Sequence, residues 1–240
     1  MSERVEQVFS LFGADRDELM GWCFQEKEEH TVCSCRERYG EITLCLAAKA
    51  ADRETAEQEL QRLTEKLRRR FDGQIYSNAG QSLQQAVVEE LKRRGWKIAT
   101  AESLTGGWVS KRITEVPGAS LVLECGVCSY SNRIKHEVLG VRQQTLDVYT
   151  EYSSQTAAEM AEGVRRLAGA DIGVSTTGIA GPGGVGDKPA GLVYVGVSTK
   201  NDTRTCELHL APSGGEDRGM VRGLAASYAL FMVWKELLGH

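Results

Sequence analysis

Residues 96–116 read WKIATAESLTGGWVSKRITEV, and this stretch indicates the fold class of most of the chain. Its first six residues predict a β-strand, residues 102–107 a turn, and residues 107–116 a helix. A serine placed directly before a helix is often only an N-cap. An N-cap does not explain the threonine and two glycines at 105–107, which would let a ligand approach the backbone. From this stretch alone, a cap and a ligand site remain equally good interpretations.

Strands and helices alternate on both sides of this stretch. Before it, Ser82 and Gln85 predict a capping box at the start of a helix that ends at Gly95. After it, the sequence predicts strands at 120–130, 171–176, 191–199 and 205–211 and helices at 132–140, 153–169 and 216–238. Such alternation is typical of α/β domains with helices on both faces of a sheet. Because the last two strands follow each other directly, we expect a three-layer α/β/α domain with a mixed sheet.

The first 75 residues predict a smaller α+β unit. The sequence patterns indicate strands at 5–13 and 41–50 and helices at 15–29 and 52–71. A polar, turn-rich segment at 76–82 then predicts a linker. We therefore expect two domains, residues 1–77 and residues 80–240.

The charge of the chain argues against a nucleic-acid partner. The 240 residues include 29 Lys and Arg and 33 Asp and Glu, for a net charge of −4. The arginines at 68–70 are better explained as the end of a solvated helix, where cations suit the helix dipole, than as a nucleic-acid patch. The longest apolar run, residues 228–234, is shorter than the roughly 20 residues that cross a bilayer. Because the first ten residues are charged and unlike a signal peptide, we expect a cytoplasmic protein with no membrane partner.

The seven cysteines do not predict a metal site. Cys33 and Cys35 form one close pair in the sequence, and Cys125 and Cys128 form another. The second pair lies in a predicted strand, where side chains three residues apart point to opposite faces and could not easily bind one ion. The four histidines form no spaced cluster either. We expect buried or incidental thiols and no metal or other cofactor.

Three segments that follow strands could carry chemistry. The first contains Ser103, the second reads CSYSNRIKHEVLG and contains Lys135, and the third is the glycine-rich loop STTGIAGPGGVGDKPAG at 175–191. A serine nucleophile needs a base, and a lysine whose pKa is lowered by burial can serve as one. A tyrosine nearby can relay a proton. Lys135 is ordinarily a solvated helix residue, so this interpretation requires that it face Ser103.

The segments TAESLTGG, VPGAS, YSNRIK, TTGIAGPGG, KPAGLVYVG and EDRGMVR occur in this order and resemble the CinA C-terminal family of nicotinamide-nucleotide amidohydrolases. The resemblance covers residues 80–238. Residues 1–75 resemble the small KH-like module that precedes this domain in full-length CinA proteins. The large molybdopterin-binding-type domain that opens those proteins is not found in this sequence, nor is the pyrophosphatase chemistry associated with it.

The resemblance implies deamidation of nicotinamide mononucleotide to nicotinate mononucleotide and ammonia, a step in pyridine nucleotide salvage. It identifies Ser103 as the nucleophile, Lys135 as its base and Tyr130 as a partner in proton transfer. The substrate-binding residues that we expect are Thr105, Gly106, Gly107, Asn132, Thr177, Gly178, Ile179, Ala180 and Gly181. Among them, the backbone N–H groups at 106 and 107 are candidates for binding the oxyanion.

Two departures from the family pattern and one alternative remain. The family usually has cysteine where this chain has Leu104, and a GAVS run where this chain has TEYS at 150–153. The alternative is a non-catalytic nucleotide-binding or interaction protein of the CinA type. RNA binding by residues 1–75 is disfavoured because they lack the G-x-x-G loop with which KH domains clamp the backbone. The last helix is apolar nearly all round at 230–234, so we expect a core or interface helix and a homo-oligomer, most simply a dimer.

Overall fold

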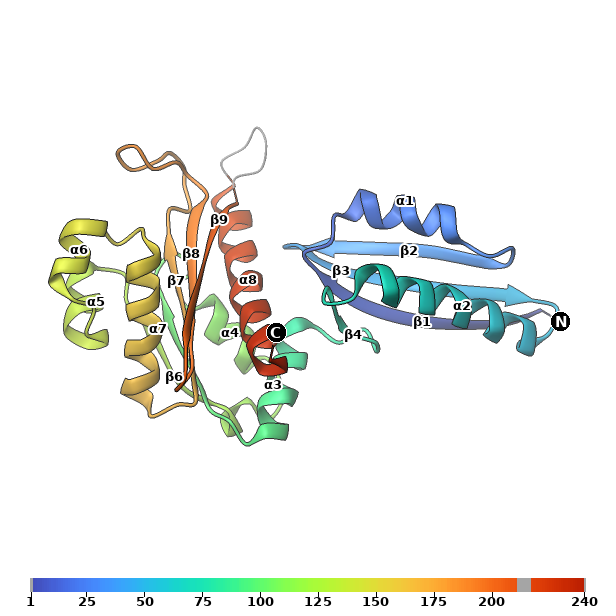
Figure 1. Ribbon diagram of the computed structural model, residues 1–240, viewed down its shortest axis with the longest axis horizontal. Coiled ribbons are helices and arrows are strands. Elements are labelled where there is room, and N and C mark those ends of the chain that lie inside the picture. The colour runs from blue at the N-terminus through green and yellow to red at the C-terminus, as the bar shows by residue number, and fades with distance from the viewer. Residues whose placement is uncertain (1, 211–216, 240) are drawn as a thin grey trace. The chain divides into compact units, whose positions relative to one another are not determined.

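Two separate β-sheets organise the chain (Figure 1). The computed structural model describes residues 2–210 and 217–239, and the chain divides into two units, Met1–Ala86 and Val87–His240. The division falls within helix α3 (Leu83–Arg94), C-terminal to the linker predicted at 76–82. Within the described ranges, no helix combines the length and apolar character needed to cross a membrane.

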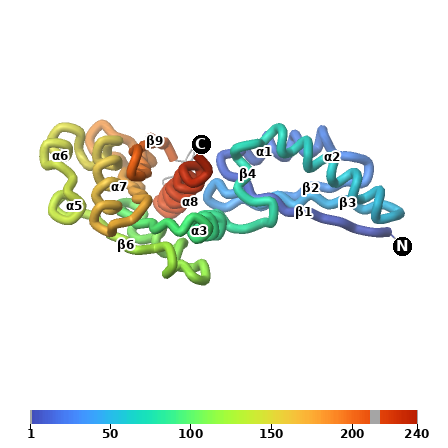
Figure 2. Tube along the Cα trace, turned by 60° about the horizontal axis from the view of Figure 1, so that its bottom comes forward, coloured from blue at the N-terminus to red at the C-terminus, as the bar shows by residue number. Residues whose placement is uncertain are grey.

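The N-terminal unit is a four-stranded antiparallel sheet in the order β2-β3-β1-β4. Its elements are β1 (Glu3–Phe12), α1 (Arg16–Glu26), β2 (Thr31–Arg38), β3 (Glu41–Ala50), α2 (Arg53–Phe71) and β4 (Ile75–Ser77). Both helices lie on one face of the sheet (Figure 2). The spacing of the apolar residues in α2 explains this position, because Leu60, Leu63 and Leu67 all lie on its buried face.

Two strands of this unit were not predicted. In β2, only alternate positions face the core, and these carry a threonine and two cysteines instead of large apolar residues, so the strand pattern is weak. The strand β4 is only three residues long, and it pairs with β1 through Ile75 and Ser77, at positions assigned in part to the linker. The linker prediction was therefore wrong for Tyr76 and Ser77, both of which are buried.

The C-terminal unit contains a mixed five-stranded sheet in the order β6-β5-β7-β8-β9, as the sequence predicted. The parallel strands are β5 (Ile98–Glu102), β6 (Leu123–Cys128) and β7 (Ile172–Gly178). The strands β8 (Leu192–Ser198) and β9 (Thr203–His209) run antiparallel to their neighbours. The carboxyl ends of β5, β6 and β7 therefore meet at one edge of the sheet, where all three candidate segments begin.

Helices cover both faces of this sheet (Figures 1 and 2). Helix α7 (Ser154–Ala168) covers one face beside α5 (Asn132–Leu139) and α6 (Gln143–Tyr149), and α8 (Arg218–Leu238) covers the other beside α4 (Trp108–Thr114). Helix α6 was not predicted. The strand predicted at 120–130 is shorter, because Ala119–Leu121 form a 3₁₀ turn. The predicted start of the last helix, at 216, lies outside the described residues.

Helix α8 is a core helix. Leu230, Val233 and Trp234 are all buried within the chain itself. Phe231 and Met232, between them, are only half-buried. The oligomeric state stays a prediction.

Candidate active site

In the turn after β5, the residue that caps helix α4 and the candidate nucleophile are two different residues. The buried Glu102 carboxylate accepts hydrogen bonds from the backbone N–H groups of Val109 (3.0 Å) and Ser110 (2.8 Å) at the start of α4. A carboxylate at this position satisfies unpaired helix donors and suits the helix dipole. Ser103 is therefore not the cap of α4. Its backbone N–H donates to the Thr176 carbonyl (2.9 Å), which holds the turn against β7.

The hydroxyl of Ser103 faces the amine of Lys135, as the catalytic interpretation requires. Lys135 Nζ lies 3.2 Å from Ser103 Oγ and 2.8 Å from the Ser129 carbonyl, with a longer contact of 3.5 Å to the Tyr130 carbonyl. When the amine is neutral, its two N–H groups can be donated to these two carbonyls. The lone pair is then directed toward Ser103, in the arrangement that a general base needs.

Because Lys135 is buried, a substantial fraction of its amine is neutral near physiological pH. The side chain is 0% exposed although it begins in an amphipathic surface helix. This desolvation lowers the pKa of Lys135 from its ordinary value of 10.5 to about 8, while the negative charge of Glu151 acts in the opposite direction. About a tenth of the amine is therefore neutral at pH 7, compared with roughly 0.03% for a solvated lysine.

Ser103 and Lys135 both line a cavity of about 220 Å³ at the carboxyl edge of the sheet. The other lining residues are Leu104, Tyr130, Glu151, Tyr152, Gly178, Ile179, Ala180, Gly181, Pro182, Gly183, Gly184, Val185 and Arg218. Most of these belong to the predicted glycine-rich loop. Of the predicted binding residues, the structure thus places four at the cavity, in the loop at 178–181.

The remaining predicted binding residues have other contacts. Thr105 is 0% exposed and its hydroxyl is 2.6 Å from that of Thr176, while the Thr177 hydroxyl donates to the Glu151 carbonyl (2.6 Å). Neither lines the cavity, so their hydroxyls position the walls, and direct substrate contact by either is not supported. Asn132 likewise does not line the cavity, but its amide donates to the Glu151 carboxylate (3.2 Å).

The two glycines after Ser103 form the turn and not the cavity wall. Gly106 and Gly107 adopt φ angles of +60° and +91°, which only glycine adopts readily. The Gly106 N–H already donates to the Ser103 carbonyl (3.2 Å). It is therefore not an oxyanion donor in this geometry. Arg222 holds the same turn by donating to the Leu104 and Thr105 carbonyls, each at 2.9 Å.

Tyr130 lies at the cavity, but its hydroxyl is not directed at the base. The residue is 67% exposed, and its hydroxyl accepts a hydrogen bond from Arg218 (3.3 Å). Arg218 also donates to the Gly181 carbonyl (2.6 Å), so its guanidinium joins α8 to the glycine-rich loop. The predicted proton relay through Tyr130 would require its side chain to move. In the observed geometry, its carbonyl is what contacts Lys135.

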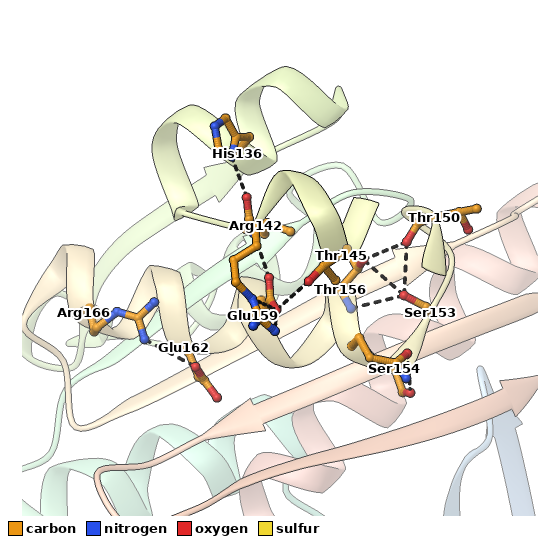
Figure 3. A network of polar contacts seen from close by, with 12 residues as sticks. His136, Arg142, Thr145, Thr150, Ser153, Ser154, Thr156, Glu159, Glu162 and Arg166 are labelled. Atoms are coloured by element: carbon orange, nitrogen blue, oxygen red, sulfur yellow. Dashed lines mark hydrogen bonds and ion pairs between the residues drawn. The ribbon is translucent and has the colours of Figure 1, made fainter. Parts of the chain in front are cut away.

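A hydrogen-bond network fixes the turn that carries Glu151 and Tyr152 (Figure 3). The Thr150 carbonyl accepts from the hydroxyls of Ser153 (3.1 Å) and Thr156 (2.7 Å). Thr150 itself has a φ of +65°, a conformation that β-branched residues rarely adopt. This strained turn is the TEYS segment in which the chain departs from the family pattern, and it brings a carboxylate and an aromatic ring to the cavity.

Lys188 connects this turn to the glycine-rich loop. Its amine donates to the Tyr152 carbonyl (2.6 Å) and the Thr150 hydroxyl (3.0 Å). Two walls of the cavity, from segments far apart in the sequence, are thereby held together.

The described residues contain no group of three or more His, Cys, Asp or Glu side chains placed to hold a metal ion. The predicted geometry of the strand cysteines is confirmed, because Cys125 packs against the core side of β6 while Cys128 faces Gly107 on the other side.

Sequence reasoning missed three side chains at this site, namely Glu151, Tyr152 and Arg218. Arg218 lies in EDRGMVR, one of the quoted family segments, so a signal for it was available. Glu151 and Tyr152 lie in the departing TEYS segment, whose place at the cavity follows only from the fold of the loop.

Residues 80–237 match the family model of the CinA C-terminal domain. Over 241 residues, the chain is 45% identical to a protein of Caldanaerobacter subterraneus subsp. tengcongensis with the provisional name competence-damage inducible protein, covering 100% of this chain and 57% of that one. It is 39% identical over 214 residues to the CinA-like protein of Kosmotoga olearia, covering 89% of this chain and 51% of that one. The chain thus spans about half the length of these curated relatives.

Solved structures agree with this similarity. The competence/damage inducible protein CihA of Agrobacterium tumefaciens is 35% identical, with a TM-score of 0.59 over 62% of this chain and 90% of that one. A CinA superfamily protein of Klebsiella pneumoniae is 30% identical, with a TM-score of 0.62 over 67% of this chain and 100% of that one. The KH-like character of residues 1–77 is tested by none of these findings and stays a prediction.

Proposed function

This chain belongs to the CinA family, and on that premise we propose that it hydrolyses nicotinamide mononucleotide to nicotinate mononucleotide and ammonia. The observation that carries the proposal is the buried amine of Lys135, 3.2 Å from the hydroxyl of Ser103 at a cavity. A desolvated lysine beside a serine is suited to activate that serine against an amide.

In the proposed reaction, neutral Lys135 takes the proton of Ser103 as Oγ attacks the carboxamide carbon. The resulting ammonium then gives its proton to the departing nitrogen, and ammonia leaves an ester on Ser103. Water, activated by the same amine, hydrolyses this ester to release the nicotinate product. The Leu104 N–H, directly after the nucleophile on the cavity wall, is our candidate for stabilising the oxyanion.

The cavity also supports recognition of the nucleotide. The Arg218 guanidinium lies on the wall and can donate to a phosphate, for which its fork geometry is well suited. The loop at 178–184 supplies backbone groups on the same wall. Gly178 is needed there because an added Cβ would lie 2.4 Å from the Leu192 carbonyl oxygen.

The experiment that tests this proposal measures ammonia release from nicotinamide mononucleotide by the full chain, with nicotinamide and nicotinamide riboside as comparison substrates. We expect turnover of the mononucleotide, loss of turnover in Ser103→Ala, and retained nucleotide binding in that variant by calorimetry. Binding without turnover in the parent chain would instead support the alternative of a non-catalytic nucleotide-binding protein. Absence of both would refute the proposed substrate.

A further inference from the structure

A second cavity lies in the N-terminal unit, between α1 and the edge strand β2. It has a volume of about 260 Å³ and is lined by Met20, Cys23, Phe24, Lys27, Thr31, Val32 and Cys33. None of these residues belongs to the candidate active site. Two of them are cysteines from different elements, and a lysine lies on the same wall.

The local geometry brings the two thiols together. Along β2, alternate side chains face α1, so Cys33 and Cys35 pack against the core while Val32 is exposed. On α1, Leu19 and Cys23 are one turn apart and both buried. Cys23 and Cys33 consequently line the same cavity and pack into the same hydrophobic cluster. Neither cysteine forms a disulfide in the structure.

The surroundings make the two thiols unequal. The neighbouring Cys23 thiol, assisted by the positive charge of Lys27, lowers the pKa of Cys33 despite partial burial. The neighbouring Cys33 thiol, together with burial, raises the pKa of Cys23. Lys27 lines the same cavity, and its amine lies over the Phe24 ring, 4.7 Å from the ring centroid. Cys33 is partly exposed and Cys23 is buried behind it, so only Cys33 is open to a reagent from solvent.

We propose that Cys23 and Cys33 form a dithiol that hydroperoxides oxidise to a disulfide joining α1 to β2. Cys33 is the attacking thiolate and Cys23 is the resolving thiol. The inference is independent of the proposed amidase, because it concerns the other unit and uses no residue of the candidate active site.

The chemistry balances with hydroperoxide as the only oxidant. The Cys33 thiolate attacks the peroxide, the O–O bond breaks, and a sulfenic acid forms while an alcohol (or water, from hydrogen peroxide) leaves after taking up a proton. The Cys23 sulfur then attacks the sulfenic sulfur of Cys33, and the S–O bond breaks. The hydroxide takes up the proton of the Cys23 thiol and leaves as water. The two thiols lose two electrons in total, and the peroxide gains them.

The first test uses the unmodified full chain. It is treated with one equivalent of hydrogen peroxide at pH 7, alkylated and mapped by mass spectrometry. We expect a Cys23–Cys33 disulfide that dithiothreitol reduces. In the reduced protein, N-ethylmaleimide should modify Cys33 at least about tenfold faster than Cys128, because reactivity follows the thiolate fraction. Cys128 is the more exposed thiol, but burial and Glu102 raise its pKa. Faster modification of Cys128, or oxidation first at another cysteine, would overturn the proposal.

Variants separate the two roles. In Cys23→Ser, dimedone should trap a sulfenic acid at Cys33 because the resolving thiol is missing. In the matched control Cys35→Ser, on the same face of β2, the Cys23–Cys33 disulfide should form as in the parent. A disulfide between Cys33 and Cys35 in the parent, or its loss in the Cys35→Ser control, would contradict the assignment. Because the mapping of the parent chain needs no variant, the proposal stays testable if Cys23→Ser fails to fold.

Discussion

Replacing Lys135 by methionine should abolish turnover. It should also remove the free-energy cost of burying a charged amine on folding, a cost that depends on pH. The amine has a pKa of about 8 in the folded chain and an ordinary value of 10.5 when solvated. Because the folded value is the lower one, the unfolded chain binds more protons between these pH values, and stability of the parent rises with pH in that window. Below pH 8, folding carries the full cost of the buried cation, about 3 kcal/mol for a shift of this size.

The pH dependence is the measurable part of this effect. At pH 7, methionine removes that cost of about 3 kcal/mol but leaves the Ser129 carbonyl without its lysine donor, which costs about 1–3 kcal/mol. The second contribution does not depend on pH. The free energy of unfolding of Lys135→Met minus that of the parent should therefore fall by about 2 kcal/mol between pH 7 and pH 9.5.

Urea denaturation at these two pH values measures the difference directly. Lys135→Arg is the matched control, since arginine remains charged throughout this range and should show the pH dependence of the methionine variant at lower stability. Neither variant should release ammonia. A difference between parent and Lys135→Met that does not change with pH would refute the argument that burial lowers the pKa of this amine.

Three further predictions follow from the same structure. Ser103→Ala and Lys135→Met should each lower turnover by about a thousandfold or more, and the double variant should be little worse, because the two groups act as a unit; additive losses in the kinetics would contradict this. Glu151→Gln removes a charge that raises the pKa of Lys135, so the pH–rate profile should move to lower pH; a shift to higher pH would show that Glu151 acts otherwise. Gly163→Ala should destabilise the chain by about 2–3 kcal/mol in urea denaturation, because the new Cβ would lie 1.9 Å from a backbone oxygen at the end of α5. The control is Gly21→Ala, whose Cβ would have nothing within 4 Å and which should be neutral or stabilising by up to about 1 kcal/mol.

The sequence by itself determined the layers of the C-terminal unit. Hydrophobic periodicity is a local property, so the alternation of strands and helices after residue 82 was readable, and the two consecutive final strands indicated a mixed sheet. The candidate serine and lysine were also readable, because each follows a predicted strand and lies in a family segment. The strands β2 and β4 could not be predicted from the sequence. The core-facing positions of β2 carry cysteines, and β4 is only three residues long, so neither strand has a clear periodic pattern.

Tertiary structure alone decided what each of these residues does. Ser103 and Lys135 are 32 positions apart and meet because β5 and β6 are parallel neighbours whose carboxyl ends coincide. The same packing buries the amine, and the lowered pKa of Lys135 follows from that burial and not from its neighbours in sequence. Glu102, and not Ser103, caps α4 for a similar reason. Only the path of the turn determines which side chain reaches the helix N-terminus. Distances between remote segments and the solvent excluded from them depend on the whole fold, so no local pattern could encode them.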